Sequence, residues 1–114
     1  NTYLHDLKNT KNLCYVNNID CLFIIQPHIF GSNIKQHLEI IDIANHSMPF
    51  YQTIHEKGYE LIIRLCDFCI DASKILNNKP DTFIDPVHFS KNGSIIVANY
   101  LEELIKSYYL NKFN

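Results

Sequence analysis

A short, continuously apolar run at residues 20–26 places the strongest constraint on what this chain can fold into. Its sequence, DCLFIIQ, is too short for a typical globular helix and is rich in residues that favour β-structure. A strand whose successive residues are nearly all apolar is buried on both faces, as strands are in a parallel sheet covered by helices. Pro27 ends the run, because proline has no N–H to donate to a sheet ladder. The run therefore predicts one strand of a parallel, helix-covered sheet.

Helical and strand-like segments alternate along the rest of the chain. Apolar residues spaced by three and four positions predict helices at about residues 3–16, 36–43 and 50–65. A second apolar run, at residues 68–70, predicts another strand. The clearest helix begins near Ser90, a residue type that favours the N-cap position.

These elements define the expected fold class. Two strands joined by a helical crossover predict a βαβ unit within a parallel sheet. A sheet of only two strands would leave open edges and too little cover for its apolar residues. We therefore expect an α/β fold in which residues 1–114 form a single incomplete domain. That domain would be the C-terminal part of a three-layer α/β/α sandwich with a parallel sheet, whose N-terminal half is missing here.

Composition excludes several classes of partner. Hydrophobic residues make up 46% of the chain, which is enough for a packed core. The formal net charge of −2 offers no basic footprint, so we expect no nucleic-acid partner. The longest apolar runs are far too short to cross a bilayer, so we expect no membrane span.

Asp85 and His88 form the motif with the most chemical content. Pro86 restricts its own backbone and that of Asp85, and the chain must turn before the following helix. A carboxylate and an imidazole three residues apart on such a turn can meet. The acid then orients the base, and the second ring nitrogen is left to accept a proton from a hydroxyl, as in a Ser-His-Asp triad. On spacing alone, an aspartate that caps a turn beside a packed histidine is the better explanation, because Asp-x-x-His is common by chance.

The residues after His88 extend the pattern. Ser90 and Gly93 follow it, and then comes a helix with the small residue Ala98, within the sequence IDPVHFSKNGSIIVANYL (residues 84–101). This segment resembles the C-terminal block of the SGNH (GDSL-type) hydrolases, which has Asp-x-x-His, a polar residue, a glycine and a helix. The upstream sequence CLFIIQP is similar to a core strand of many members. The resemblance covers most of the chain from about residue 20 onward.

What the resemblance implies is the flavodoxin-like fold and activity of that family. Its members are esterases, lipases and acetylhydrolases that use no metal or organic cofactor, so we expect a small-molecule, carbohydrate or lipid ester as substrate. Asp85 and His88 would be the catalytic acid and base of the triad. The Gly-Asp-Ser block that carries the nucleophile is absent, as are the Gly and Asn blocks that bind the oxyanion. The resemblance therefore implies part of a carboxylic ester hydrolase that is inactive alone.

Two further residues are weaker candidates. Gln26 follows the predicted strand, at the edge where open α/β sheets bind ligands, and it is a candidate substrate-binding residue. A solvent-exposed strand end explains Gln26 equally well. Ser32 lies in the sequence FGSN, which resembles a nucleophile turn, but it lacks the Gly-Asp-Ser pattern and turn formation explains it better.

An even count of four cysteines could mean two disulfides in a secreted protein, but each lies among apolar residues, and we interpret them as buried free thiols. Cys66 and Cys69 form a Cys-x-x-Cys pair, which can be a redox dithiol or half of a zinc site. No other cysteine or histidine has tight ligand spacing to them, so we expect no metal. Two alternatives to the hydrolase stay open. One is a non-catalytic, degenerate module on the same scaffold, and the other is a small metal or dithiol module built on Cys66 and Cys69.

Overall fold

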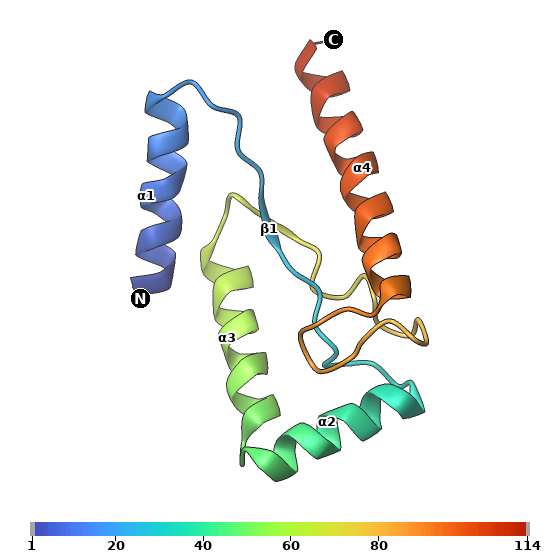
Figure 1. Cartoon of the computed structure of the whole chain (residues 1–114). Coiled ribbons are helices and arrows are strands. Elements are labelled where there is room, and N and C mark those ends of the chain that lie inside the picture. The colour runs from blue at the N-terminus through green and yellow to red at the C-terminus, as the bar shows by residue number, and fades with distance from the viewer. Residues whose placement is uncertain (1, 114) are drawn as a thin grey trace.

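The computed structural model describes residues 2–113 of the chain. In chain order the elements are α1 (Thr2–Val16), β1 (Phe23–Ile25), α2 (Lys35–Ser47), α3 (Tyr51–Leu65), β2 (Cys69–Asp71) and α4 (Lys91–Phe113) (Figure 1). Every predicted helix and strand is present. The largest differences in bounds are at β1, which is shorter than the predicted strand, and at α2, which extends beyond the predicted residue 43.

The expected three-layer α/β/α sandwich is wrong for the described chain. The structure is mostly helical, and its sheet consists of two parallel strands of three residues each, with Ile24 paired to Ile70. Only residues 23–25 of the apolar run gain a partner, because β2 is equally short and no other described strand joins the sheet. Of residues 21–25, only Ile25 is buried. The apolar pattern therefore identified the strand but overstated how much sheet surrounds it.

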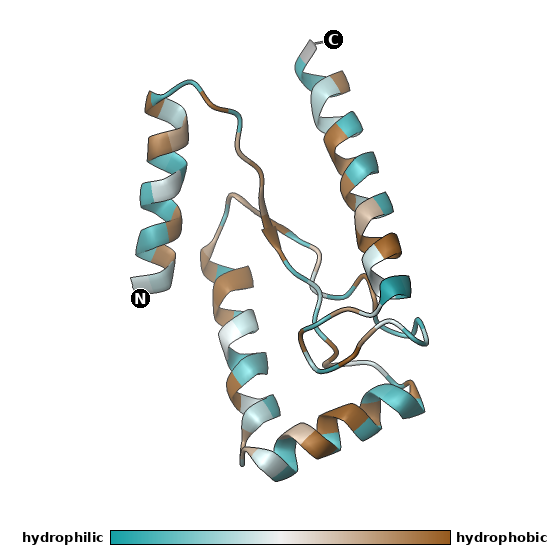
Figure 2. Cartoon of the chain, viewed as in Figure 1, coloured by the Kyte–Doolittle hydropathy of each residue, from teal (hydrophilic) through white to brown (hydrophobic). Residues whose placement is uncertain are grey.

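The helices surround this strand pair unevenly. In Figure 1, α1 and α3 lie on one side of β1 and α4 lies on the other. Figure 2 shows apolar residues along the whole of β1, whereas the helices are mixed in hydropathy. Neither α1 nor α3 contributes a fully buried residue. None of the helices in the described range 2–113 is both long and apolar enough to cross a membrane.

The buried core lies beyond the carboxyl ends of the two strands. Its central side chains come from the loops after β1 and β2 and from α2: Ile29, Phe30, Ile41, Leu76 and Phe83. Side chains of α4 and of the loop before it pack against this cluster. The best-packed part of the molecule therefore supports the loops at one edge of the sheet.

The chain as a whole is less compact than a complete domain of its size. Its accessible surface is 7883 Å², whereas a compact monomer of this mass exposes about 6,500 Å². Its radius of gyration is 16.0 Å, against about 13 Å for a compact domain of this length. Large apolar side chains are exposed on all four helices. The chain therefore exposes more surface than a compact monomer of its mass, and part of that surface is apolar.

Two disulfides replace the free thiols expected from the sequence, and that interpretation is wrong. Cys14 at the end of α1 pairs with Cys21 just before β1, and Cys66 pairs with Cys69 across the turn between α3 and β2. Asn18 has a left-handed backbone (φ 55°), which turns the chain back after α1. The turn brings the Cα atoms of Cys14 and Cys21 to 6.2 Å, within the range that a disulfide bridges.

Candidate functional site

The loop between β2 and α4 holds the candidate acid and base. Phe83 and Phe89 form an isolated antiparallel bridge, and the N–H of Ile84 donates to the carbonyl oxygen of His88 at 2.9 Å. Phe83 is buried in the core, and its ring lies edge-on to that of Phe89. The bridge closes a narrow loop whose tip carries Asp85 and His88, anchored by two aromatic side chains.

The start of α4 fixes the other end of this loop. Ser90 caps the helix as expected, because its Oγ accepts a hydrogen bond from the N–H of Gly93 at 3.1 Å. The N–H of Ser90 donates to the carbonyl oxygen of Thr82 at 3.0 Å. A Cβ atom added to Gly93 would lie 2.1 Å from the same carbonyl oxygen. The serine and glycine of the motif therefore hold the first turn of α4 directly against the loop.

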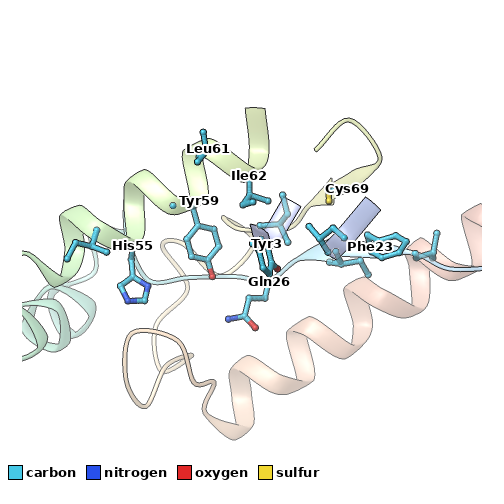
Figure 3. A pocket seen from close by; sticks show the side chains of 14 residues that line it. Tyr3, Phe23, Gln26, His55, Tyr59, Leu61, Ile62 and Cys69 are labelled. Atoms are coloured by element: carbon cyan, nitrogen blue, oxygen red, sulfur yellow. The ribbon is translucent and has the colours of Figure 1, made fainter. Parts of the chain in front are cut away.

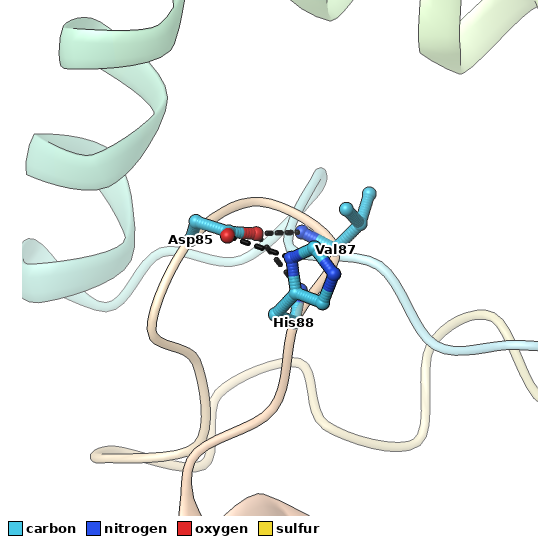
Figure 4. A network of polar contacts seen from close by, with 3 residues as sticks. All are labelled: Asp85, Val87 and His88. Carbon is cyan, nitrogen blue, oxygen red and sulfur yellow. Dashed lines mark hydrogen bonds and ion pairs between the residues drawn. The ribbon is translucent and has the colours of Figure 1, made fainter.

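The Asp85 carboxylate organises the tip of the loop. Its Oδ1 accepts hydrogen bonds from the backbone N–H groups of Val87 at 3.0 Å and His88 at 2.9 Å. Its Oδ2 lies 2.7 Å from Nδ1 of the His88 ring (Figure 4). The structure thus brings the two predicted site residues into direct contact, and the same aspartate also caps the turn.

The protonation of the pair follows from these contacts. Burial raises the pKa of Asp85, but hydrogen bonds from the backbone of Val87 and from the side chain and backbone of His88 outweigh it and lower that pKa below its ordinary value. Asp85 is therefore an anion at neutral pH and can only accept, so Nδ1 of His88 carries the proton. Nε2 of His88 makes no hydrogen bond to any described residue. It is the nitrogen that remains to accept a proton.

Both side chains are accessible to a reactant. The His88 side chain is 74% exposed and that of Asp85 is 46% exposed. An exposed ion pair of this kind contributes only about 0.2–1 kcal/mol to stability. The contact with Asp85 therefore matters more for orienting the accessible imidazole of His88 than for the stability of the fold.

The pair lies on the side of the sheet where the strands end. The carbonyl oxygen of Pro86 accepts a hydrogen bond from the N–H of Ile29 at 3.3 Å, which ties the loop to the segment after β1. The N–H of His28 donates to the carbonyl oxygen of Ser73, which joins the segments that follow the two strands. Ligands of open α/β sheets bind at this carboxyl edge.

Gln26 is at this edge too, although it contacts neither Asp85 nor His88 through a hydrogen bond. It is exposed, it hydrogen-bonds with Tyr59 of α3, and it lines a cavity of about 780 Å³ (Figure 3). Burial raises the pKa of Tyr59, and the bond to Gln26 partly offsets that rise. The structure thus places Gln26 at the rim of a cavity beside β1.

Sequence reasoning missed a face of α3 that links this cavity to the loop. Tyr51, His55 and Tyr59 follow one another at intervals of four residues and therefore share one face of the helix. The rings of Tyr51 and His55 stack with centroids 4.2 Å apart, and Tyr59 lies edge-on to His28 at 4.2 Å. Burial raises the pKa of Tyr51, and the nearby negative charge of Asp85 adds to that rise. The four-residue interval of these three ring side chains was the available signal.

Ser32 does contact a histidine, but in a buried network. Its Oγ lies 2.7 Å from Nδ1 of His37, and Nε2 of His37 lies 3.3 Å from Oγ1 of Thr82. The Thr82 hydroxyl donates to the carbonyl oxygen of Lys79, so its Oγ1 accepts a hydrogen bond from Nε2–H of His37. Nδ1 of His37 then carries no proton and accepts a hydrogen bond from the hydroxyl of Ser32. Ser32 and Thr82 are buried, and His37 is completely inaccessible. The network joins α2 to two loops, and a substrate could not reach Ser32.

Neither a nucleophile nor a metal site accompanies the pair within residues 2–113. No described serine, threonine or cysteine hydrogen-bonds to His88, and Ser90 is used as a helix cap. No three His, Cys, Asp or Glu side chains of the described chain gather closely enough to hold a metal ion. Cys66 and Cys69 are joined to each other, so they offer no thiolate ligands in this state.

Comparisons with known proteins add no relative. The chain matches no protein-family model, no curated protein and no solved structure. The likeness to SGNH hydrolases therefore depends on the motif around Asp85 and His88 and on the strand before it.

Proposed function

We propose that this chain supplies the acid and the base of a Ser-His-Asp ester hydrolase whose serine nucleophile lies outside these residues. The observation that carries the proposal is the 2.7 Å contact between Oδ2 of Asp85 and Nδ1 of His88, with the opposite ring nitrogen unpaired and exposed. An acid that holds Nδ1–H leaves Nε2 as the base, which is the division of labour that triad chemistry needs.

Three features support the proposal beyond the pair itself. The pair lies beyond the strand ends, where substrates of α/β sheets bind. The loop is held by the core and by the first turn of α4, so the two side chains are positioned on a rigid support. The surplus surface and the two-stranded sheet leave room for further polypeptide. The proposed substrate class is an ester of a small molecule, a carbohydrate or a lipid.

The alternative is a non-catalytic module that keeps the acid and base but has lost its nucleophile. The lack of any described hydroxyl or thiol bonded to His88 favours this alternative for the chain alone. The two hypotheses differ in whether the protein contains a reactive serine, because only the hydrolase needs a serine that His88 activates.

Labelling with a fluorophosphonate separates the two hypotheses, since this probe reacts much faster with a serine that a general base activates than with an ordinary serine. The protein encoded by the complete reading frame should be labelled, whereas residues 1–114 alone should not. His88→Ala should reduce labelling of the complete protein by about 10²–10⁴-fold, the usual contribution of a general base. Labelling that is absent, or that is unchanged by His88→Ala, would leave the non-catalytic module as the better account.

A further inference from the structure

The cavity of about 780 Å³ beside β1 has an elongated lining (Figure 3). Residues 22–26 border it along the strand, and at the rise of a strand they span about 13 Å. Residues between Ile54 and Ile62 border it along α3, and at the rise of a helix they span about 12 Å. Because the strand and the helix border the cavity over similar lengths, its shape suits an extended molecule better than a compact one.

The two ends of this cavity differ in chemistry. Gln26, His55 and Tyr59 lie toward one end, whereas Phe23 lies toward the other (Figure 3). Gln26 hydrogen-bonds with Tyr59, and burial raises the pKa of Tyr59, so its phenol keeps its proton at neutral pH. The His55 ring stacks on Tyr51, and its nitrogens make no hydrogen bond to a described residue. The polar end therefore has a donor and an acceptor that remain free for a ligand.

The lining of the cavity carries no fixed charge. None of the described residues that line it is Lys, Arg, Asp or Glu, and Cys69 offers no thiolate because it is bonded to Cys66. A carboxylate or an ammonium group would lose its hydration there without gaining a fixed opposite charge, which is strongly unfavourable. A hydroxyl or an amide loses less, and it can both donate to and accept from Gln26 and His55. The lining therefore favours an uncharged head group.

Gly58 leaves space in the cavity wall that the described chain does not use. It lies inside α3, where glycine is among the least favourable residues for a helix. An added Cβ atom would meet nothing within 4 Å, so no described neighbour requires a glycine at this position. Tyr3 and Ile54, which also border the cavity, are each 60% exposed. A bound molecule would fill the gap at Gly58 and cover apolar surface that water now reaches.

We propose that this cavity binds a neutral amphiphile with one unbranched hydrocarbon chain and one uncharged head that forms hydrogen bonds. The chain lies between β1 and α3, and the head reaches Gln26 and His55. A polypeptide segment fits less well, because it carries a donor and an acceptor at nearly every residue, whereas polar side chains gather at one end of the cavity. The inference does not rest on the proposed function, since neither Asp85 nor His88 lines the cavity and no bond is made or broken.

Binding of 1-octanol, measured by isothermal titration calorimetry, tests the inference. Octanoate and octylammonium have the same chain with a charged head, and each should bind at least about tenfold more weakly, a factor that corresponds to 1.4 kcal/mol. 1,8-Octanediol would place a second hydroxyl at the apolar end, and it should be weaker by a similar factor. Intermolecular NOEs should connect the methyl group of 1-octanol to the ring of Phe23 and the carbon that bears its hydroxyl to the side chain of Gln26.

Variants of α3 provide the matched control. Gly58→Leu adds a side chain at the cavity wall and should weaken the binding of 1-octanol by at least about tenfold. Glu60→Leu adds the same side chain at an exposed position outside the cavity lining and should leave binding unchanged. Circular dichroism should show both variants folded, since leucine is among the most favourable residues for a helix.

Several results would overturn the inference. They are an absence of 1-octanol binding, equal or tighter binding of octanoate or octylammonium, and binding that Gly58→Leu leaves unchanged. Equal weakening by Glu60→Leu would show that the helix surface, and not the cavity, holds the ligand. Self-association that Gly58→Leu abolishes would make a second copy of the chain the occupant. Binding of 1-octanol by a complete protein that fluorophosphonate fails to label would refute the proposed function and leave the ligand site standing.

Discussion

The carbonyl oxygen of Thr82 occupies the space into which a side chain at Gly93 would project, only 2.1 Å from an added Cβ atom. This backbone-to-backbone approach brings the first turn of α4 onto the loop that carries Asp85 and His88. The N–H of Ser90 bonds to the same oxygen, so the helix start and the loop share one anchor. The position of the acid and the base therefore depends on a residue that touches neither of them.

Replacing Gly93 with alanine should destabilise the chain. The added methyl group meets a backbone atom that cannot rotate away, and overpacking of this kind costs about 1–3 kcal/mol. Gly58→Ala is the matched control, because its Cβ meets nothing within 4 Å and alanine favours helix by about 1 kcal/mol. Urea denaturation should show Gly93→Ala less stable and Gly58→Ala slightly more stable than the wild type. An equal shift in both variants would contradict the close approach.

Two substitutions of Asp85 should separate its two functions, which are to cap the turn and to orient the His88 ring. Asp85→Asn keeps an oxygen that accepts from the N–H groups of Val87 and His88 and should change stability little. Asp85→Ala leaves those groups unpaired and should cost about 1 kcal/mol. If the proposed function holds, Asp85→Asn should lower the rate of ester hydrolysis by about 10³–10⁴-fold through loss of the correct tautomer of His88. Steady-state rates of both variants, measured beside their unfolding curves, would show whether the two effects are distinct.

Two buried histidines should make the fold sensitive to mild acid. Burial lowers the pKa of both His28 and His37, and the nearby charges of Glu56, Asp71 and Asp81 offset this only in part. As the pH falls below the ordinary histidine pKa of about 6.5, the unfolded chain binds protons that the folded chain does not. The free energy of unfolding should therefore decrease between about pH 7.5 and pH 5.5.

The double variant with His28→Asn and His37→Gln should flatten this pH dependence. Asn can still accept from the N–H of Phe30, as Nδ1 of His28 does at 3.1 Å. Urea midpoints of the wild type and the variant, measured across that pH range, check the prediction. A wild-type chain that is equally stable at both ends of the range would refute it.

Secondary structure and the local motif followed from the sequence because both depend on near neighbours. Pro27 ends the strand segment, Ser90 caps α4, and Asp85 meets His88 because a turn of three residues leaves few alternatives. The number of strands in the sheet could not be predicted from the sequence. An apolar run shows that a strand favours burial, but it does not show which other strands or helices bury it. The cluster of His28 and Tyr59 was also missed, since it joins residues from separate elements.

The cysteine state was a further error, and it yields its own prediction. Local apolar context favoured free thiols, but the turn at Asn18 brings Cys14 and Cys21 together. Because α1 has no buried residue, we expect the Cys14–Cys21 disulfide to contribute strongly to holding this helix beside β1. Cys14→Ser with Cys21→Ser should speed hydrogen exchange throughout α1 and leave unchanged the protection of the amides of Ile84 and Ser90, which donate to His88 and Thr82 beside the core. Equal loss of protection at those two amides would show that α1 is an integral part of the fold.

The tautomer of His88 tests the central claim most directly. A long-range proton–nitrogen NMR spectrum of the neutral His88 ring distinguishes a protonated Nδ1 from a protonated Nε2. The account predicts that Nδ1 carries the proton in the wild type, held by Asp85, and that Asp85→Ala shifts the ring toward the Nε2–H form. A wild-type ring with its proton on Nε2 would contradict the account, because His88 would then have no free nitrogen on the side where a hydroxyl must be deprotonated.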